Sequence, residues 1–101
     1  LDADGRYHLA LLELAAGQPG AARAEADTVL QSEPRHLLAL YVAAEAERAL
    51  GQPDRAAALY RRYLDAYDPD SLGSRPEYLQ HQPVLPRAAE EARAFLRTMG
   101  R

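Results

Sequence analysis

Two pairs of side chains have the spacing that metal ligands and ion pairs share on helices. His8 follows Asp4 and His81 follows Glu77, each after four residues, so the members of a pair fall on one face of a helix. The third histidine, His36, is distant from both, and none of the three lies in a recognised metal-binding motif. Because two ligands do not make a metal site, we predict solvated ion pairs at helix ends, with no metal and no cofactor.

The segment DPDSLG imitates the opening of a calcium-binding loop. Asp68, Asp70 and Gly73 occupy the first, third and sixth positions of such a loop. The twelfth position, which should hold a bidentate glutamate, is Leu79 here. We therefore predict that this segment forms a turn and not a calcium site.

The sequence contains no nucleophile in a setting typical of catalysis. The chain has no cysteine, and its serines and threonines lie neither in a Gly-x-Ser-x-Gly motif nor beside a convincing base. There is also no glycine-rich phosphate-binding loop. The sequence therefore predicts no catalytic residues and no enzymatic activity in this segment.

Charge and composition argue against further classes of protein. A net charge of -3 over 101 residues gives no basic surface for nucleic acid. The longest apolar runs are far shorter than the roughly 20 residues of a membrane span, and no signal sequence is recognised. All 12 basic residues are arginine, which indicates a GC-rich, bacterial genome. Because the chain has no cysteine, the sequence does not distinguish the cytoplasm from the periplasm as its compartment. Since the chain begins at Leu1, we expect it to be a piece of a longer protein.

The elements that must position any site are helices. Apolar residues that recur every three or four positions predict four helices, at 4–16, 20–32, 36–50 and 54–67. Gly51 is suited to the left-handed residue after the third helix, and Asp54 is expected to cap the fourth. Prolines and glycines predict irregular structure afterwards, with one helical turn at 77–81, and an amphipathic run predicts a last helix at 86–99.

The two helix pairs superimpose when the chain is shifted by 34 residues. The matching positions are Tyr7 and Tyr41, Ala10 and Ala44, Glu13 and Glu47, Ala15 and Ala49, Gly17 and Gly51, Ala22 and Ala56, and Leu30 and Leu64. A helix-turn-helix unit of this length, with small residues where its helices cross and a closing Pro34, resembles the tetratricopeptide repeat family.

The resemblance implies an all-α, right-handed stack of helix-turn-helix hairpins with a C-terminal capping helix. We expect a single helical-repeat domain over 1–101, with repeat one at about 4–34, repeat two at about 37–69, an irregular proline-rich segment at 70–85 and a capping helix at 86–99. An alternative is that the residues after 69 are a degenerate third repeat. Repeats of this kind bury their apolar faces only by stacking, so further repeats or another chain are expected at the open end.

The resemblance also implies a function, namely a non-enzymatic scaffold that binds a protein or peptide segment in a concave groove. Carried over by position, the groove would be lined by Tyr7, His8, Leu11, Leu38, Tyr41, Val42, Glu45 and Arg48, with Asp4 beside them. Tyr7 and Tyr41 would then form an aromatic ladder. In the alternative interpretation both tyrosines pack between helices and only their hydroxyls meet water.

Two other functions remain open from the sequence. The chain could be a self-assembly element that pairs through the apolar face of its last helix, which carries Phe95, Leu96 and Met99. It could also be an accessory domain of a larger bacterial enzyme or secretion machine.

Overall fold

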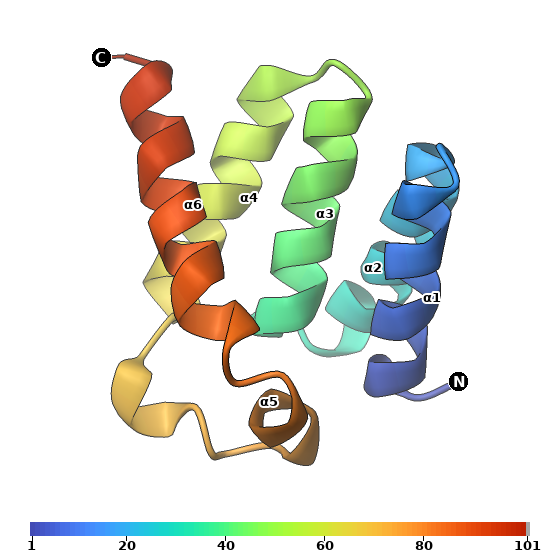
Figure 1. Ribbon diagram of the computed structural model, residues 1–101, viewed down its shortest axis with the longest axis vertical. Helices are drawn as coiled ribbons and strands as arrows, with labels where there is room; N and C mark the ends of the chain where they lie inside the picture. Colours follow the sequence, from blue (N-terminus) through green and yellow to red (C-terminus); the bar gives the residue numbers. More distant parts are fainter. Residues whose placement is uncertain (101) are drawn as a thin grey trace.

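The protein is a stack of α-helices in a computed structural model that describes residues 1–100. Within those residues no strand is formed (Figure 1). The elements are α1 (Ala3–Ala15), α2 (Pro19–Ser32), α3 (Leu37–Ala49), α4 (Pro53–Ala66), a 3-10 turn (Pro69–Ser71), α5 (Pro76–Gln80) and α6 (Val84–Thr98). Each expected helix is therefore present, and α6 begins two residues earlier than expected. No helix in the described part combines the length and apolarity of a membrane span.

The repeated glycines end the first helix of each hairpin. Gly17 and Gly51 have φ of +75° and +74°, the left-handed region in which a side chain is strained. After α1, the Gly17 amide donates to the Leu14 carbonyl at 3.1 Å and the Gln18 amide donates to the Glu13 carbonyl at 2.8 Å, which is a Schellman motif. The same two bonds close α3, so the shared Gly-Gln-Pro sequence is a shared helix stop.

The start of α4 differs from the expected one. Gln52 is the N-cap, Pro53 is the first helical residue and Asp54 lies in the first turn. Proline's fixed φ and missing N–H suit the first helical position, so the helix begins two residues earlier than an Asp54 cap would allow. The Asp54 carboxylate still meets the positive end of the helix dipole.

Small side chains let the helices approach closely. Ala10, Ala22, Ala44 and Ala56, which the 34-residue register pairs, are all 1% exposed or less. The helix α3 packs against α2 and α4, and α4 packs against α6. A larger residue at any of these alanines would force two helices apart.

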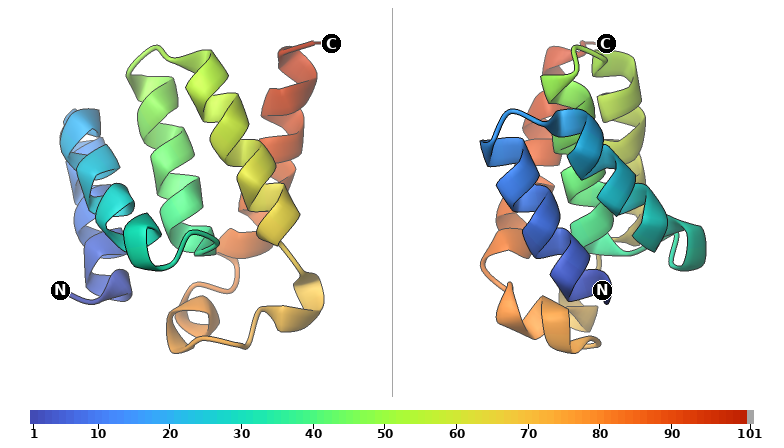
Figure 2. Two further views of the ribbon diagram at one scale, coloured as in Figure 1. Left: turned by 180° about the vertical axis from the view of Figure 1, so that it is seen from behind. Right: turned by 90° about the vertical axis from the view of Figure 1, so that its right-hand side faces the viewer.

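The stack has two sides. Viewed edge-on in the right panel of Figure 2, α1 and α6 lie toward one side, α2 and α4 lie toward the other, and α3 lies between them. In sequence α6 comes last, yet it lies beside α4 and in contact with α3. The helix thus forms one wall of the face to which α1 also contributes.

The apolar face of α6 packs in part against the core. Phe95 and Leu96 are half-buried against the core, and the Phe95 ring lies 5.1 Å from the ring of Tyr60. The guanidinium of Arg48 stacks over Phe95 at 4.9 Å from its centroid. Part of this face thus covers α4, while Leu96 and Met99 also border a hollow between α4 and α6.

Candidate functional site

A groove of about 360 Å³ opens on the face shared by α1, α3 and α6. Side chains from these three helices line it, namely Tyr7 and Leu11 of α1, Tyr41 of α3, and Val84, Arg87, Ala88 and Glu91 of α6. The α6 residues recur every three or four positions, which places them on one side of the helix. Three of the expected groove residues thus come together, and the last helix supplies the rest of the wall.

Two of the groove side chains can offer surface to a partner. Leu11 is 37% exposed, and Arg87 is exposed with only a local bond, from its Nε to the Pro83 carbonyl at 3.0 Å. Tyr41 is half-buried; its ring packs edge-on against Tyr63 with centroids 6.4 Å apart. An apolar side chain and an unshielded cation beside an aromatic edge suit a protein segment with mixed apolar and acidic character.

Tyr7 contributes less to the groove than the expected aromatic ladder requires. It is only 5% exposed, and its ring packs edge-on against the His81 ring at 4.9 Å. Tyr7 is therefore packed between structural elements, whereas part of Tyr41 is exposed. The two tyrosines are equivalent in the repeat, but a different neighbour covers each.

Leu38 and Val42 lie in the core and do not line the groove. They are 0% and 1% exposed. The helix α3 has neighbours on several sides, so the positions that border the groove on an outer helix are covered on this central one. Their assignment to the groove surface was wrong for that reason.

A polar cluster closes one end of the α3–α6 contact. Arg48 donates from Nη1 to Oε2 of Glu91 at 2.8 Å and to the Tyr60 hydroxyl at 3.1 Å. The Tyr60 hydroxyl donates to Glu45, and the Tyr41 hydroxyl donates to Oε1 of Glu91 at 3.0 Å. Glu45 and Arg48, both expected to face a ligand, are therefore already engaged within the chain.

The pKa values of Glu45 and Glu91 in this cluster are shifted in opposite directions. Burial and, to a smaller extent, the hydrogen bond with Glu91 raise the pKa of Glu45 to about 7, although the hydrogen bond from Tyr60 opposes the rise. Burial would also raise the pKa of Glu91, but its hydrogen bonds from Glu45 and Tyr41 and the charge of Arg48 outweigh this and lower it. Below about pH 7 the arrangement is that of a neutral carboxyl hydrogen-bonded to a carboxylate.

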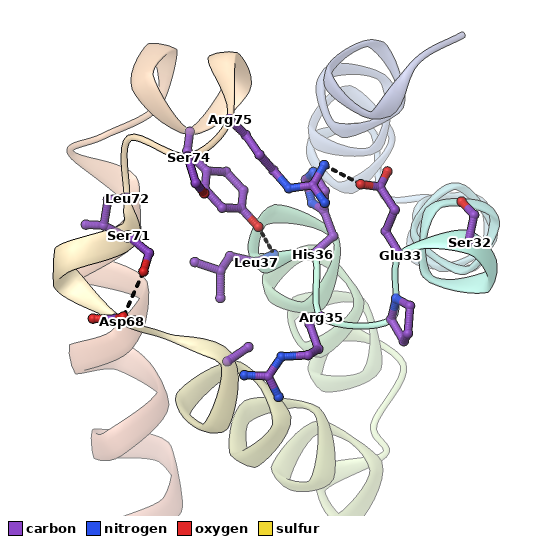
Figure 3. A pocket seen from close by; sticks show the side chains of 13 residues that line it. Ser32, Glu33, Arg35, His36, Leu37, Asp68, Ser71, Leu72, Ser74 and Arg75 are labelled. Carbon is purple, nitrogen blue, oxygen red and sulfur yellow. Dashed lines mark hydrogen bonds and ion pairs between the residues drawn. The ribbon is translucent and has the colours of Figure 1, made fainter.

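A second hollow, also of about 360 Å³, lies at the start of α3 (Figure 3). Glu33 forms an ion pair there with Arg75, and His36, only 1% exposed, bonds through Nε2 to Glu77 at 2.7 Å. Its Nδ1 accepts from the Ala39 amide at 3.4 Å, so Nε2 is the nitrogen that donates. Because these charged groups are paired within the chain, their contacts hold the segment after α4 in place.

The buried hydroxyl of Tyr78 completes this anchor. It accepts a hydrogen bond from the Leu37 amide at 2.8 Å, at the first residue of α3. In the neighbouring turn Asp68 caps the 3-10 helix, accepting from the Asp70 amide at 3.0 Å and from the Ser71 hydroxyl at 2.7 Å. The DPDSLG segment is thus a capped turn, as the sequence predicts.

Of the two expected histidine pairs, Asp4 with His8 is present and Glu77 with His81 is not. Glu77 is not paired with His81, because it pairs with His36 instead. Nε2 of His81 lies 2.9 Å from Oδ1 of Asp4, and Nε2 of His8 lies 3.4 Å from the same oxygen. His8, expected in the groove, thus lies in a cluster of three beside it, which local spacing could not predict.

The contributions of α6 were also missed from the sequence. Val84, Arg87 and Glu91 carry a helical period, but the face of α6 that would meet α3 depends on how the irregular segment places the helix. The sequence therefore showed which residues share one face of this helix, but it did not show that this face would border the groove.

Comparison with known proteins identifies the family. The family model described as tetratricopeptide repeat matches residues 7–71. The chain is 40% identical over 70 residues to proteins named "FK506-binding protein-like" from Rattus norvegicus and Homo sapiens, and 39% identical to the one from Mus musculus. These matches cover 69% of this chain and 20% of each relative, so the chain spans about a fifth of their length. No solved structure matches it. With more than half of its residues matched and its hairpins stacked as described, the chain belongs to the tetratricopeptide repeat family.

Proposed function

We propose that this domain binds a segment of a partner protein in the groove between α1, α3 and α6. Tetratricopeptide repeats are generally protein–protein interaction modules, and the observation that supports this use here is the groove itself. It joins an exposed Leu11, the edge of Tyr41 and an exposed Arg87. The partner segment would carry an apolar side chain to cover Leu11 and an acidic one to meet Arg87.

The groove is suited to binding and offers little for catalysis. Its polar groups nearest α3 are hydrogen-bonded to one another, and Arg48 and Glu91 are engaged as a pair. The residues that remain accessible are an apolar side chain and a cation. We therefore infer a scaffold role in which shape and charge select the partner.

A displayed random-peptide library, selected against the folded domain, supplies the probe peptide. Its affinity is then measured for the wild type and for Leu11→Ser. Removing a central apolar contact typically weakens binding by about tenfold or more. Leu12→Ser is the matched control, because Leu12 is the next residue on α1, is 69% exposed and does not line the groove.

Arg87→Glu tests the charge preference in the same assay, with Arg55→Glu, an exposed arginine on α4, as its control. An acidic probe peptide should lose affinity with the first change and keep it with the second. If Leu11→Ser and Arg87→Glu both bind the peptide as tightly as their controls do, the groove is not the binding site.

The source and compartment are further inferences. The arginine-only basic residues favour a GC-rich bacterial genome, in which either cytoplasm or periplasm would house such a scaffold. The relatives named above are mammalian and do not bear on that source.

A further inference from the structure

Three side chains capable of binding a metal converge beside the groove. Asp4 and His8 come from the first two turns of α1, and His81 comes from the end of α5. One potential ligand atom of each lies within 4.8 Å of those of the other two. His81 and Asp4 are 77 residues apart in sequence, so the cluster joins the two ends of the domain.

The distances approach those of a coordination shell. In a tetrahedral zinc site with bonds of about 2.0–2.1 Å, neighbouring ligand atoms lie about 3.3 Å apart. The Asp4 oxygen lies 2.9 Å from Nε2 of His81 and 3.4 Å from Nε2 of His8. The two imidazole rings are tilted by 60° with their centroids 4.9 Å apart, so the main adjustment on binding would be in the separation of their nitrogens.

The cluster is accessible, and one of its ligands is held in place. The side chains of His8, Asp4 and His81 are 53%, 30% and 16% exposed, so an ion can enter from solvent. The His81 ring packs edge-on against Tyr7, which limits its orientation. Such packing lowers the cost of ordering a ligand when the metal binds.

We propose that Asp4, His8 and His81 form a binding site for one divalent transition-metal ion, with Zn²⁺ as the best-suited member of the class. Two imidazoles and one carboxylate are the ligands that zinc, nickel and copper accept, whereas calcium and magnesium require mainly oxygen. Three protein ligands leave a fourth position for water. A bound ion would tie α1 to the loop that precedes α6, and so fix two walls of the groove relative to each other.

Calorimetric titration of the metal-free domain with ZnCl2 tests the site, together with thermal unfolding with and without zinc. The wild type should bind one ion per chain, and zinc should raise its Tm. His8→Gln and His81→Gln should each lower the affinity by at least about tenfold and remove most of the rise in Tm. His8→Gln is the safer variant, because His8 is the most exposed ligand and glutamine is a good helix former.

Asp4→Asn and Asp54→Asn form the matched pair for the carboxylate. Both aspartates are the second residue of their helix, in α1 and α4, but Asp54 is exposed and belongs to no such cluster. Asp4→Asn should weaken zinc binding and Asp54→Asn should leave it unchanged. The proposal is overturned if the folded wild type takes up no zinc at about 0.1 mM, or if His8→Gln and His81→Gln bind as the wild type does.

Discussion

Replacing Glu45 by glutamine should stabilise the protein at pH 8 and change its stability much less at pH 5. Glu45 is half-buried in the contact between α3 and α6, and its pKa is raised from 4.5 to about 7, first by burial and then by the hydrogen bond with Glu91. Between these two values the folded state binds a proton that the unfolded state has released. The free energy of unfolding therefore falls as the pH rises from about 4.5 to about 7, and stays lowered above that.

The size of the effect follows from the same pKa. A rise from 4.5 to about 7 corresponds to about 3 kcal/mol of difference between the protonated and ionised forms. Glu45 retains 26% side-chain exposure, so solvent screens part of this difference. We therefore expect Glu45→Gln to gain about 1–2 kcal/mol at pH 8, which is about 5–10 °C in Tm for a domain of this size.

Urea denaturation followed by circular dichroism at pH 5 and pH 8 measures this difference. Glu90→Gln is the control, because it removes the same charge from a side chain that is 73% exposed on α6. Its effect should be small at both pH values. A gain for Glu45→Gln that is as large at pH 5 as at pH 8, or a loss at pH 8, would refute the assignment of the proton to Glu45.

Two further substitutions test how the elements are held. Tyr78→Phe removes the acceptor of the buried Leu37 amide and should lower the free energy of unfolding by about 1–3 kcal/mol in urea denaturation; a change below about 0.5 kcal/mol would mean that water replaces the hydroxyl. Gly51→Ala should cost about 1–2 kcal/mol because of its φ of +74°, whereas Gly20→Ala, inside α2 with open space around it, should gain about 0.5 kcal/mol; equal effects in thermal unfolding would contradict the role of Gly51 as a helix stop.

The hairpins could be predicted because their determinants are local. A helix stop needs only a glycine at the right place, and Gly17 and Gly51 supply it 34 residues apart. The close helix crossings need only small residues such as Ala10 and Ala44, which the same register pairs. Period and helix order therefore follow from residues that are neighbours in sequence.

The side chains that face the groove could be predicted only in part. The repeat register places Leu38 and Val42 on the first helix of the second hairpin, but it does not say how many neighbours that helix has. In the structure α3 is central and buries both residues, while their counterparts on the outer α1, Asp4 and His8, keep exposed surface. Which member of an equivalent pair meets solvent is decided by the rest of the stack.

The irregular segment between α4 and α6 is the element on which the groove and the histidine cluster both depend. Its position is set by contacts over long sequence distances, from His36 to Glu77 and from the Leu37 amide to Tyr78. No local pattern encodes such contacts, since each partner alone is an ordinary polar residue. By fixing α5, these bonds place His81 beside α1, and the buried bond from the Tyr63 hydroxyl to the Leu85 carbonyl at 2.7 Å fixes the start of α6. The irregular segment between α4 and α6 thus determines where α6, the third wall of the groove, lies.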